Sequence, residues 1–128
     1  MDPIVHFEIP ADSIERAQKF YSGVFGWNIK KFDMPKGPPY FVVHTTEVDK
    51  KQMPKKPGAI NGGMMKRSQK GEGPTLVIDV KSIDTYLKKI EKARGRLVVP
   101  KFPIGDMGFY ARIADTEGNI IGLWESAK

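Results

Sequence analysis

A histidine and a glutamate stand two residues apart near the start of the chain, at His6 and Glu8. Alternate residues of a β-strand project from the same face, so both side chains would point the same way in an extended segment. Val5, Phe7 and Ile9 would then form the opposite, apolar face. An imidazole beside a carboxylate on a partly buried wall has linked titration and suits acid–base or polarising chemistry. The alternative is a histidine satisfied by a neighbour; we favour a role in a pocket because the helix-facing positions are already apolar.

Two similar series of elements must position this pair. Asp12 or Ser13 can cap a helix whose apolar residues recur at helical spacing up to Gly26. A second helix of the same kind starts after the cap residue Ser82 and ends at Gly95, 69 residues further on (95 − 26). Strands are expected at residues 4–10, 27–32, 40–45 and 59–65 around the first helix, and at 75–80, 97–99, 109–114 and 120–125 around the second.

Turn-forming residues separate these strands. Residues 35–39 are rich in proline and read as a turn, and Pro100 is expected to close the strand at 97–99 before a turn at 103–106. Residues 115–119 read as a hairpin turn with Gly118 at a positive φ. Each half of the chain therefore reads strand, helix, strand, strand, strand.

The repeat predicts an α+β fold of two paired βαβββ modules. One half of this size cannot easily bury both faces of its own sheet, whereas two halves can join into a curved mixed sheet around a cleft, with the helices outside. We expect one domain over residues 1–128, made of module 1 (about 1–66), a loop at 67–73, and module 2 (about 74–128).

Composition excludes several classes of protein. The chain has no cysteine, so disulfides, thiolate metal sites and a cysteine nucleophile are excluded, which fits a reducing cytoplasm. The net charge of +6 comes without aromatic residues interleaved among the basic ones, so we expect no nucleic-acid partner. The N-terminus has no signal-peptide pattern and no apolar stretch is long enough to span a bilayer, so we expect no membrane partner and a cytoplasmic location.

The chain resembles the glyoxalase / bleomycin-resistance / extradiol-dioxygenase superfamily, also called vicinal oxygen chelate proteins. The resemblance rests on residues 6–10, 20–27 and 60–65 in the first half, and on residues 78–80, 115–119 and 121–125 in the second. It covers essentially the whole chain in the right order. It implies paired βαβββ modules, a small-molecule ligand in a cleft inside the sheet, and a homodimer.

Metal-binding members of this superfamily hold a divalent ion at four positions, one on each of four strands. Carried over to this chain, these positions fall on His6, near residues 61–63, on Thr75 and on Gly122. Only His6 is a suitable ligand, whereas a divalent site normally needs three or more protein ligands. We therefore expect no cofactor, with a divalent metal ion as the alternative. Thr116 also departs from the proline common at its position.

Strand parity predicts which residues share the face of His6. Thr75, Gly122 and Trp124 lie on that face, and Tyr110 and Arg112 are expected to project into the same cleft. Arg112 could bind an anionic substrate or be a surface arginine. Tyr110 and Trp124 could form an apolar wall or belong to the core. Glu125 has the opposite parity from Trp124 and is not counted as a ligand; nor do we give His44 or Trp27 a role.

Three functions remain open at this point. The first is a glyoxalase-related enzyme without the metal tetrad, such as a lyase or isomerase related to lactoylglutathione lyase, in which His6 and Glu8 are catalytic and Thr75, Tyr110, Arg112, Gly122 and Trp124 shape the pocket. The second is a non-catalytic protein that sequesters a ligand, as bleomycin-resistance members do. The third is an interaction domain with a vestigial cleft.

Overall fold

The computed structural model describes residues 1–33 and 37–127, which form two compact units. The first module is His6–Pro74, and the second module combines Met1–Val5 with Thr75–Lys128. The short segment at the N-terminus thus groups with the second half of the chain. Inside the second module, the backbone N–H of Asp79 donates to the carbonyl of Pro3 at 3.0 Å.

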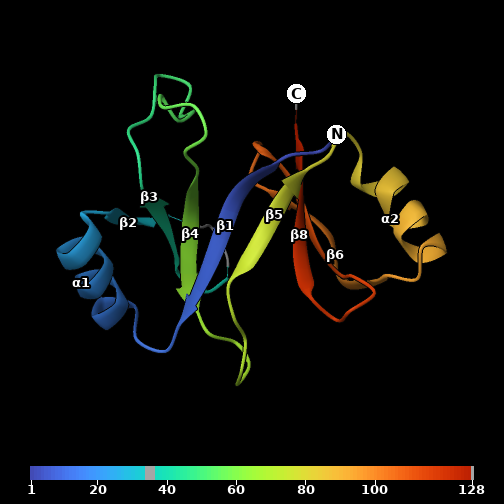
Figure 1. Ribbon diagram of the computed structural model, residues 1–128, viewed down its shortest axis with the longest axis horizontal. Coiled ribbons are helices and arrows are strands. Elements are labelled where there is room, and N and C mark those ends of the chain that lie inside the picture. The colour runs from blue at the N-terminus through green and yellow to red at the C-terminus, as the bar shows by residue number, and fades with distance from the viewer. Residues whose placement is uncertain (34–36, 128) are drawn as a thin grey trace. The chain divides into compact units, whose positions relative to one another are not determined.

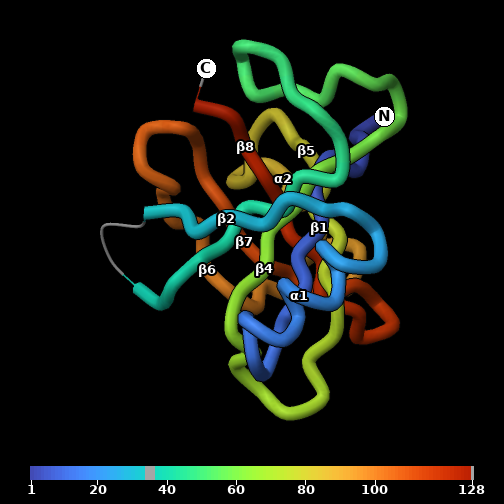
Figure 2. The backbone as a smooth tube through the Cα atoms, turned by 90° about the vertical axis from the view of Figure 1, so that its left-hand side faces the viewer, coloured from blue at the N-terminus to red at the C-terminus, as the bar shows by residue number. Residues whose placement is uncertain are grey.

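The first module is a four-stranded sheet with one helix on one face. Its strands run in the order β2-β3-β4-β1. β1 and β4 are parallel, and the other neighbours are antiparallel. Figure 2 looks onto α1, which crosses in front of β4 and β1. The elements are β1 (Ile4–Ala11), α1 (Ile14–Phe25), β2 (Asn28–Phe32), β3 (Tyr40–His44) and β4 (Asn61–Lys66).

Local sequence explains where α1 begins and ends. The Ser13 hydroxyl accepts a hydrogen bond from the backbone N–H of Arg16, which makes Ser13 the N-cap. Gly26 has φ 74°, the left-handed conformation that glycine adopts at helix ends, and its N–H donates to the carbonyl of Ser22. Ile14 and Tyr21 pack against a core that includes the fully buried Met64.

The second module repeats this plan. Its strands run in the order β5-β8-β7-β6, with β5 and β8 parallel and the remaining neighbours antiparallel. Figure 1 shows α2 beside this sheet, as α1 is beside the sheet of the first module. The elements are β5 (Thr75–Asp79), α2 (Ile83–Lys92), β6 (Arg96–Ile104), β7 (Gly108–Ala114) and β8 (Ile120–Ser126). The predicted α+β class and the two βαβββ modules are confirmed.

Two features of the second module differ from the prediction. β6 continues through Pro100 and Pro103, because it is the edge strand and its pairing with β7 shifts register between Leu97 and Val99 and between Val99 and Phe102. Proline is tolerated at edges and bulges because no ladder hydrogen bond is lost there. α2 ends at Lys92, and Arg94 rather than Gly95 takes the positive φ of 74°.

The remaining turn predictions concern two loops. Gly118 has φ 84°, as the hairpin turn at 115–119 requires, and the carboxylate of Asp115 accepts hydrogen bonds from the backbone N–H groups of Glu117 and Asn119. The turn at residues 35–39 lies partly outside the described residues. No helix among the residues that the structure describes is long and apolar enough to cross a membrane.

Candidate functional site

His6 and Glu8 lie on the sheet face that α1 leaves uncovered. On β1, Phe7 and Ile9 pack with the α1 core, so alternation turns His6 and Glu8 to the other face. In the parallel pairing with β4, His6 stands beside Asn61 and Glu8 beside Gly63. His6 is partly buried, and Glu8 is only 7% exposed. The structure therefore places both residues as the sequence predicts, on a wall that is largely shielded from water.

Tyr40, which the sequence did not single out, is the hydrogen-bond partner of His6. The Tyr40 hydroxyl lies 3.0 Å from Nε2 of His6, although 34 residues separate the two in the chain. Tyr40 opens β3, where it stands opposite Met65 of β4. The two strands β1 and β3 flank β4 in the sheet, so the contact crosses over β4.

Gly63 provides the space for this contact. Gly63 lies on β4 between β1 and β3, next to Glu8 on one side and Val42 on the other. A Cβ atom at this position would lie 1.7 Å from the hydroxyl oxygen and 2.2 Å from Cζ of Tyr40. The tyrosine ring therefore occupies the volume that any other residue at position 63 would fill.

The environment of His6 favours the neutral imidazole. Burial lowers the pKa of His6 below 6.5, because removing the ring from water disfavours its charged form. The negative charge of Glu8 acts in the opposite direction and raises this pKa, but by less. Near neutral pH, His6 is therefore able to accept or donate one hydrogen bond at each ring nitrogen, and Tyr40 takes one of them.

The second module carries its predicted residues on the corresponding face. Phe109, Ala111 and Ile113 of β7 pack with the α2 core, which turns Tyr110 and Arg112 away from the helix. In the antiparallel pairing of β7 with β8, Tyr110 stands opposite Trp124, and Arg112 stands opposite Gly122. These four residues thus share one face, as predicted.

Tyr110, Arg112 and Gly122 repeat the arrangement of the first module. The Nε–H of Arg112 donates to the hydroxyl oxygen of Tyr110 at 2.9 Å, and the guanidinium lies 5.9 Å from the centre of the Tyr110 ring. A Cβ atom at Gly122 would lie 2.7 Å from the Tyr110 hydroxyl and 3.0 Å from Val77. As in the first module, a glycine of the last strand leaves room for the ring of a tyrosine from the preceding strand.

Thr75 and Trp124 complete the predicted set in this module. Thr75 opens β5 and is 3% exposed, so its hydroxyl is buried. Trp124 is partly buried, and its indole occupies the space above Gly108, where a Cβ atom would lie 2.7 Å from Cζ2. The neighbouring Glu125 points to the helix side and accepts the backbone N–H of Ile83 at 2.7 Å. It therefore caps α2.

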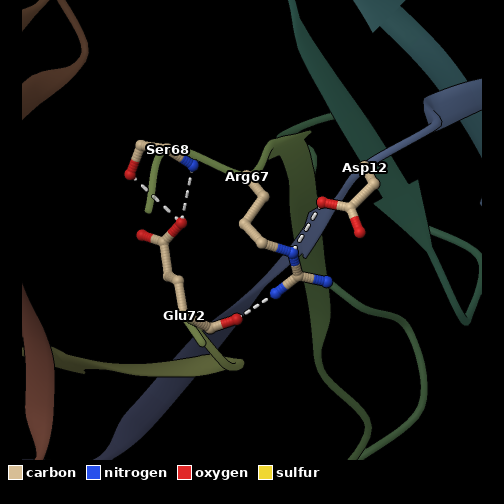
Figure 3. A network of polar contacts seen from close by, with 4 residues as sticks. All are labelled: Asp12, Arg67, Ser68 and Glu72. Atoms are coloured by element: carbon tan, nitrogen blue, oxygen red, sulfur yellow. Dashed lines mark hydrogen bonds and ion pairs between the residues drawn. The ribbon is translucent and has the colours of Figure 1, made fainter. Parts of the chain in front are cut away.

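A separate polar network closes the end of the first module (Figure 3). Nε of Arg67 donates to the Asp12 carboxylate at 2.9 Å, and Nη1 of Arg67 donates to the carbonyl of Glu72. The Glu72 carboxylate in turn accepts hydrogen bonds from the backbone N–H and the hydroxyl of Ser68. The polar groups that line this open surface pocket form hydrogen bonds with one another. We therefore interpret the network as one that stabilises the loop at residues 67–73.

Solved structures share this fold at low sequence identity. The hypothetical protein BH1468 from Bacillus halodurans has a TM-score of 0.71 and 16% identity, covering 99% of this chain and 96% of its own. Methylmalonyl-CoA epimerase from Mycobacterium tuberculosis has a TM-score of 0.67 and 17% identity, over 98% and 88% of the two chains. The Streptomyces coelicolor epimerase in complex with 2-nitronate-propionyl-CoA has a TM-score of 0.68 and 15% identity, over 98% and 97%.

Sequence comparisons identify two further kinds of match. Residues 3–38 match the family model described as bleomycin resistance protein-like N-terminal. Over 114 residues, 86% of this chain, the sequence is 30% identical to the protein named "Putative glyoxylase CFP32" in Mycobacterium bovis and Mycobacterium tuberculosis. Together these matches indicate the glyoxalase / bleomycin-resistance (vicinal oxygen chelate) superfamily as the group that this chain is similar to. The chain spans 40% of the length of these mycobacterial relatives.

The structure shows what occupies the positions of this superfamily's metal ligands. His6 is hydrogen-bonded to Tyr40, Thr75 has a buried side chain with a hydroxyl group, and Gly122 packs against the Tyr110 ring. Among residues 1–33 and 37–127, no group of three or more His, Asp or Glu side chains is placed to hold a metal ion. The absence of the vicinal oxygen chelate tetrad, with His6 as its one matching ligand, stays a prediction.

Proposed function

We propose that this chain binds a small molecule on the sheet face that carries His6 and acts on it without the metal tetrad of its superfamily. The observation that carries this proposal is the hydrogen bond between Nε2 of His6 and the hydroxyl of Tyr40 on a partly buried wall. A neutral imidazole held in one orientation can polarise a ligand oxygen or exchange a proton with it. Glu8 acts electrostatically on His6 and raises its pKa, so it favours the protonated form of the ring.

The donor set supports a mechanism without the tetrad. Zinc and related divalent ions are bound by imidazole, thiolate and carboxylate groups, usually three or four together. Gly122 has no side chain, and the place where one would begin is filled by the ring of Tyr110. Thr75 offers only a neutral hydroxyl. These residues do not fit a tetrad with His6, so the proposed chemistry uses the protein's own hydrogen-bond donors and acceptors.

A second candidate function is ligand sequestration without turnover. It is favoured by the family match over residues 3–38, because this segment contains both His6 and Glu8 and is described as bleomycin resistance protein-like. A binder needs the same polar wall but no proton transfer. Homodimer formation, which the resemblance also implies, stays a prediction that sedimentation would test.

A defined ligand panel tests both functions. It would contain S-lactoylglutathione, methylmalonyl-CoA and bleomycin, chosen from the chemistry of related proteins, and would be screened by the shift in melting temperature. We expect at least one class to stabilise the protein, and the stabilisation to be lost in His6→Gln. Proton NMR with substoichiometric protein then shows whether the bound ligand is converted. Stabilisation without conversion supports the binder, and no stabilisation by any class would contradict both functions.

A further inference from the structure

Each module of the chain holds a tyrosine in the volume of a missing side chain. In the first module, the Tyr40 ring lies over Gly63, and in the second, the Tyr110 ring lies over Gly122. The two arrangements occupy matching register positions. Gly63 pairs with Val42 and Tyr40 with Met65, just as Gly122 pairs with Arg112 and Tyr110 with Trp124. We call each glycine a tyrosine seat.

The tyrosine hydroxyl meets the main polar side chain of its module in both cases. Tyr40 contacts Nε2 of His6 at 3.0 Å, and Tyr110 accepts from Nε of Arg112 at 2.9 Å. The same packing of tyrosine on glycine occurs with a histidine in one module and with an arginine in the other. The packing therefore does not depend on one particular polar partner. The glycine fixes the position of the tyrosine hydroxyl, and the hydroxyl in turn orients the polar side chain.

We propose that Tyr40, seated on Gly63, is the positioning residue for His6: its hydroxyl donates to Nε2 and thereby keeps the proton of the neutral imidazole on Nδ1. The inference rests on the proposed function and specifies it. With Nε2 occupied as an acceptor, His6 serves the ligand as an N–H donor from Nδ1 and polarises a ligand oxygen. It does not act as a base at Nε2.

Among the described residues, few charged groups share this face of the first module. On the uncovered face, β1 carries Glu8, β3 carries His44, and β2 carries Lys30, which pairs with Val42. The residues of β4 on this face, Asn61, Gly63 and Met65, do not titrate. Glu8 favours the protonated ring, whereas burial favours the neutral one.

Nitrogen-15 NMR of the histidine side chains tests this directly, because the chain has only two histidines. The untagged protein is used, and His44→Gln assigns the signals. At neutral pH we expect His6 to show a protonated Nδ1 and an unprotonated Nε2. In Tyr40→Phe, a protonated Nε2 is expected to appear and the pKa of His6 to rise by about 0.5 to 1 pH unit, because one hydrogen bond to the neutral form is lost.

Gly63→Ala provides the second arm of the experiment. This substitution retains the His6 and Tyr40 side chains but displaces the Tyr40 ring. It should therefore change the His6 spectrum in the same way as Tyr40→Phe does. Gly23→Ala is the matched control and should leave the His6 signals unchanged, because a Cβ atom at Gly23 meets nothing within 4 Å. If Gly63→Ala does not fold, Tyr40→Phe alone decides, because it removes only one oxygen atom.

Two results would overturn the proposal. One is a protonated Nε2 on His6 in the unmodified protein, and the other is an unchanged His6 tautomer and pKa in Tyr40→Phe. The measurement is made on the free protein, so its outcome does not depend on the ligand panel. The NMR result can therefore contradict the positioning role of Tyr40 while the ligand panel still shows binding through His6. Equally, the NMR result can support the positioning role while no ligand of the panel binds.

Discussion

At the scale of single residues, the sequence predicted the polar pair but not its partner. His6 and Glu8 are only two positions apart, so strand alternation alone places them on one face. Tyr40 reaches His6 across β4, and that requires the register of β3 on β4, which depends on a 16-residue connection (45–60). No local pattern specifies this register. The signal available was Gly63, a glycine inside a strand, which often marks the close approach of another group.

The lowered pKa of His6 predicts how stability depends on pH. Well above pH 6.5 the ring is neutral in the folded and unfolded chains, so it has no effect on the pH dependence. As the pH falls from about 7 to about 5, the unfolded chain binds a proton at His6 more readily, so the free energy of unfolding decreases. In His6→Gln, this decrease should be smaller. Urea unfolding at several pH values measures it, and identical pH slopes in the two proteins would contradict the assignment.

The tyrosine seat of the second module gives a stability prediction. Gly122→Ala places a Cβ atom 2.7 Å from Tyr110 and 3.0 Å from Val77, so overpacking should reduce the free energy of unfolding by about 1 to 3 kcal/mol. Gly23→Ala is the matched control on α1, where helix propensity should raise stability by about 0.5 to 1 kcal/mol. The denaturant concentrations at the unfolding midpoints of the two variants and the parent protein measure these effects. Equal and small effects of both substitutions would mean that Tyr110 is not held on Gly122.

At the scale of elements, the helices were predicted better than the edge strand. Capping residues and apolar spacing are local, and the structure confirms Ser13 and Ser82 as N-caps. β6 was predicted to stop at Pro100, but it runs to Ile104 because it pairs with β7 alone. Whether a strand lies at the edge of a sheet is decided by the tertiary fold, so proline could not be interpreted correctly from its neighbours.

The start of α2 depends on two side chains from different elements. The Ser82 hydroxyl accepts from the N–H of Thr85 at 3.2 Å, and the Glu125 carboxylate of β8 accepts from the N–H of Ile83 at 2.7 Å. We expect Ser82→Ala to destabilise the protein by about 1 kcal/mol. Glu125→Ala should also destabilise it, whereas Glu125→Gln retains an acceptor oxygen and should have less effect. Thermal unfolding ranks the three variants, and a Glu125→Ala protein as stable as the parent would refute the capping role.

At the scale of the whole chain, the repeat correctly predicted two modules of the same plan. It could not show that Met1–Val5 group with the second module. That grouping depends on long-range contacts, among them the hydrogen bond of 2.6 Å from the Tyr86 hydroxyl to the Asp2 carboxylate, 84 residues away. The candidate site was predicted as a set of strand faces, and its hydrogen bonds became visible only with the strand register.

The contact between Asp2 and Tyr86 gives a prediction for the N-terminal segment. The hydrogen bond to Asp2 is the largest of the effects that raise the pKa of Tyr86 above 10.0. In Asp2→Asn, the charge is removed, and the pKa of Tyr86 should move back toward its ordinary value. Carbon-13 NMR of the tyrosine rings follows this titration. An unaltered Tyr86 titration would show that Asp2 does not hold the hydroxyl in solution.

In the proposed function, the chain binds its ligand through His6 and without the metal tetrad. Calorimetric titration of the metal-stripped protein with the best ligand from the panel, in the presence of a chelator, tests it most directly. We expect binding to persist under the chelator and to be weakened at least about tenfold in His6→Gln, which corresponds to about 1.4 kcal/mol. Binding that disappears with the chelator and returns with stoichiometric Zn²⁺ or Ni²⁺, or that is unaffected by His6→Gln, would contradict the account.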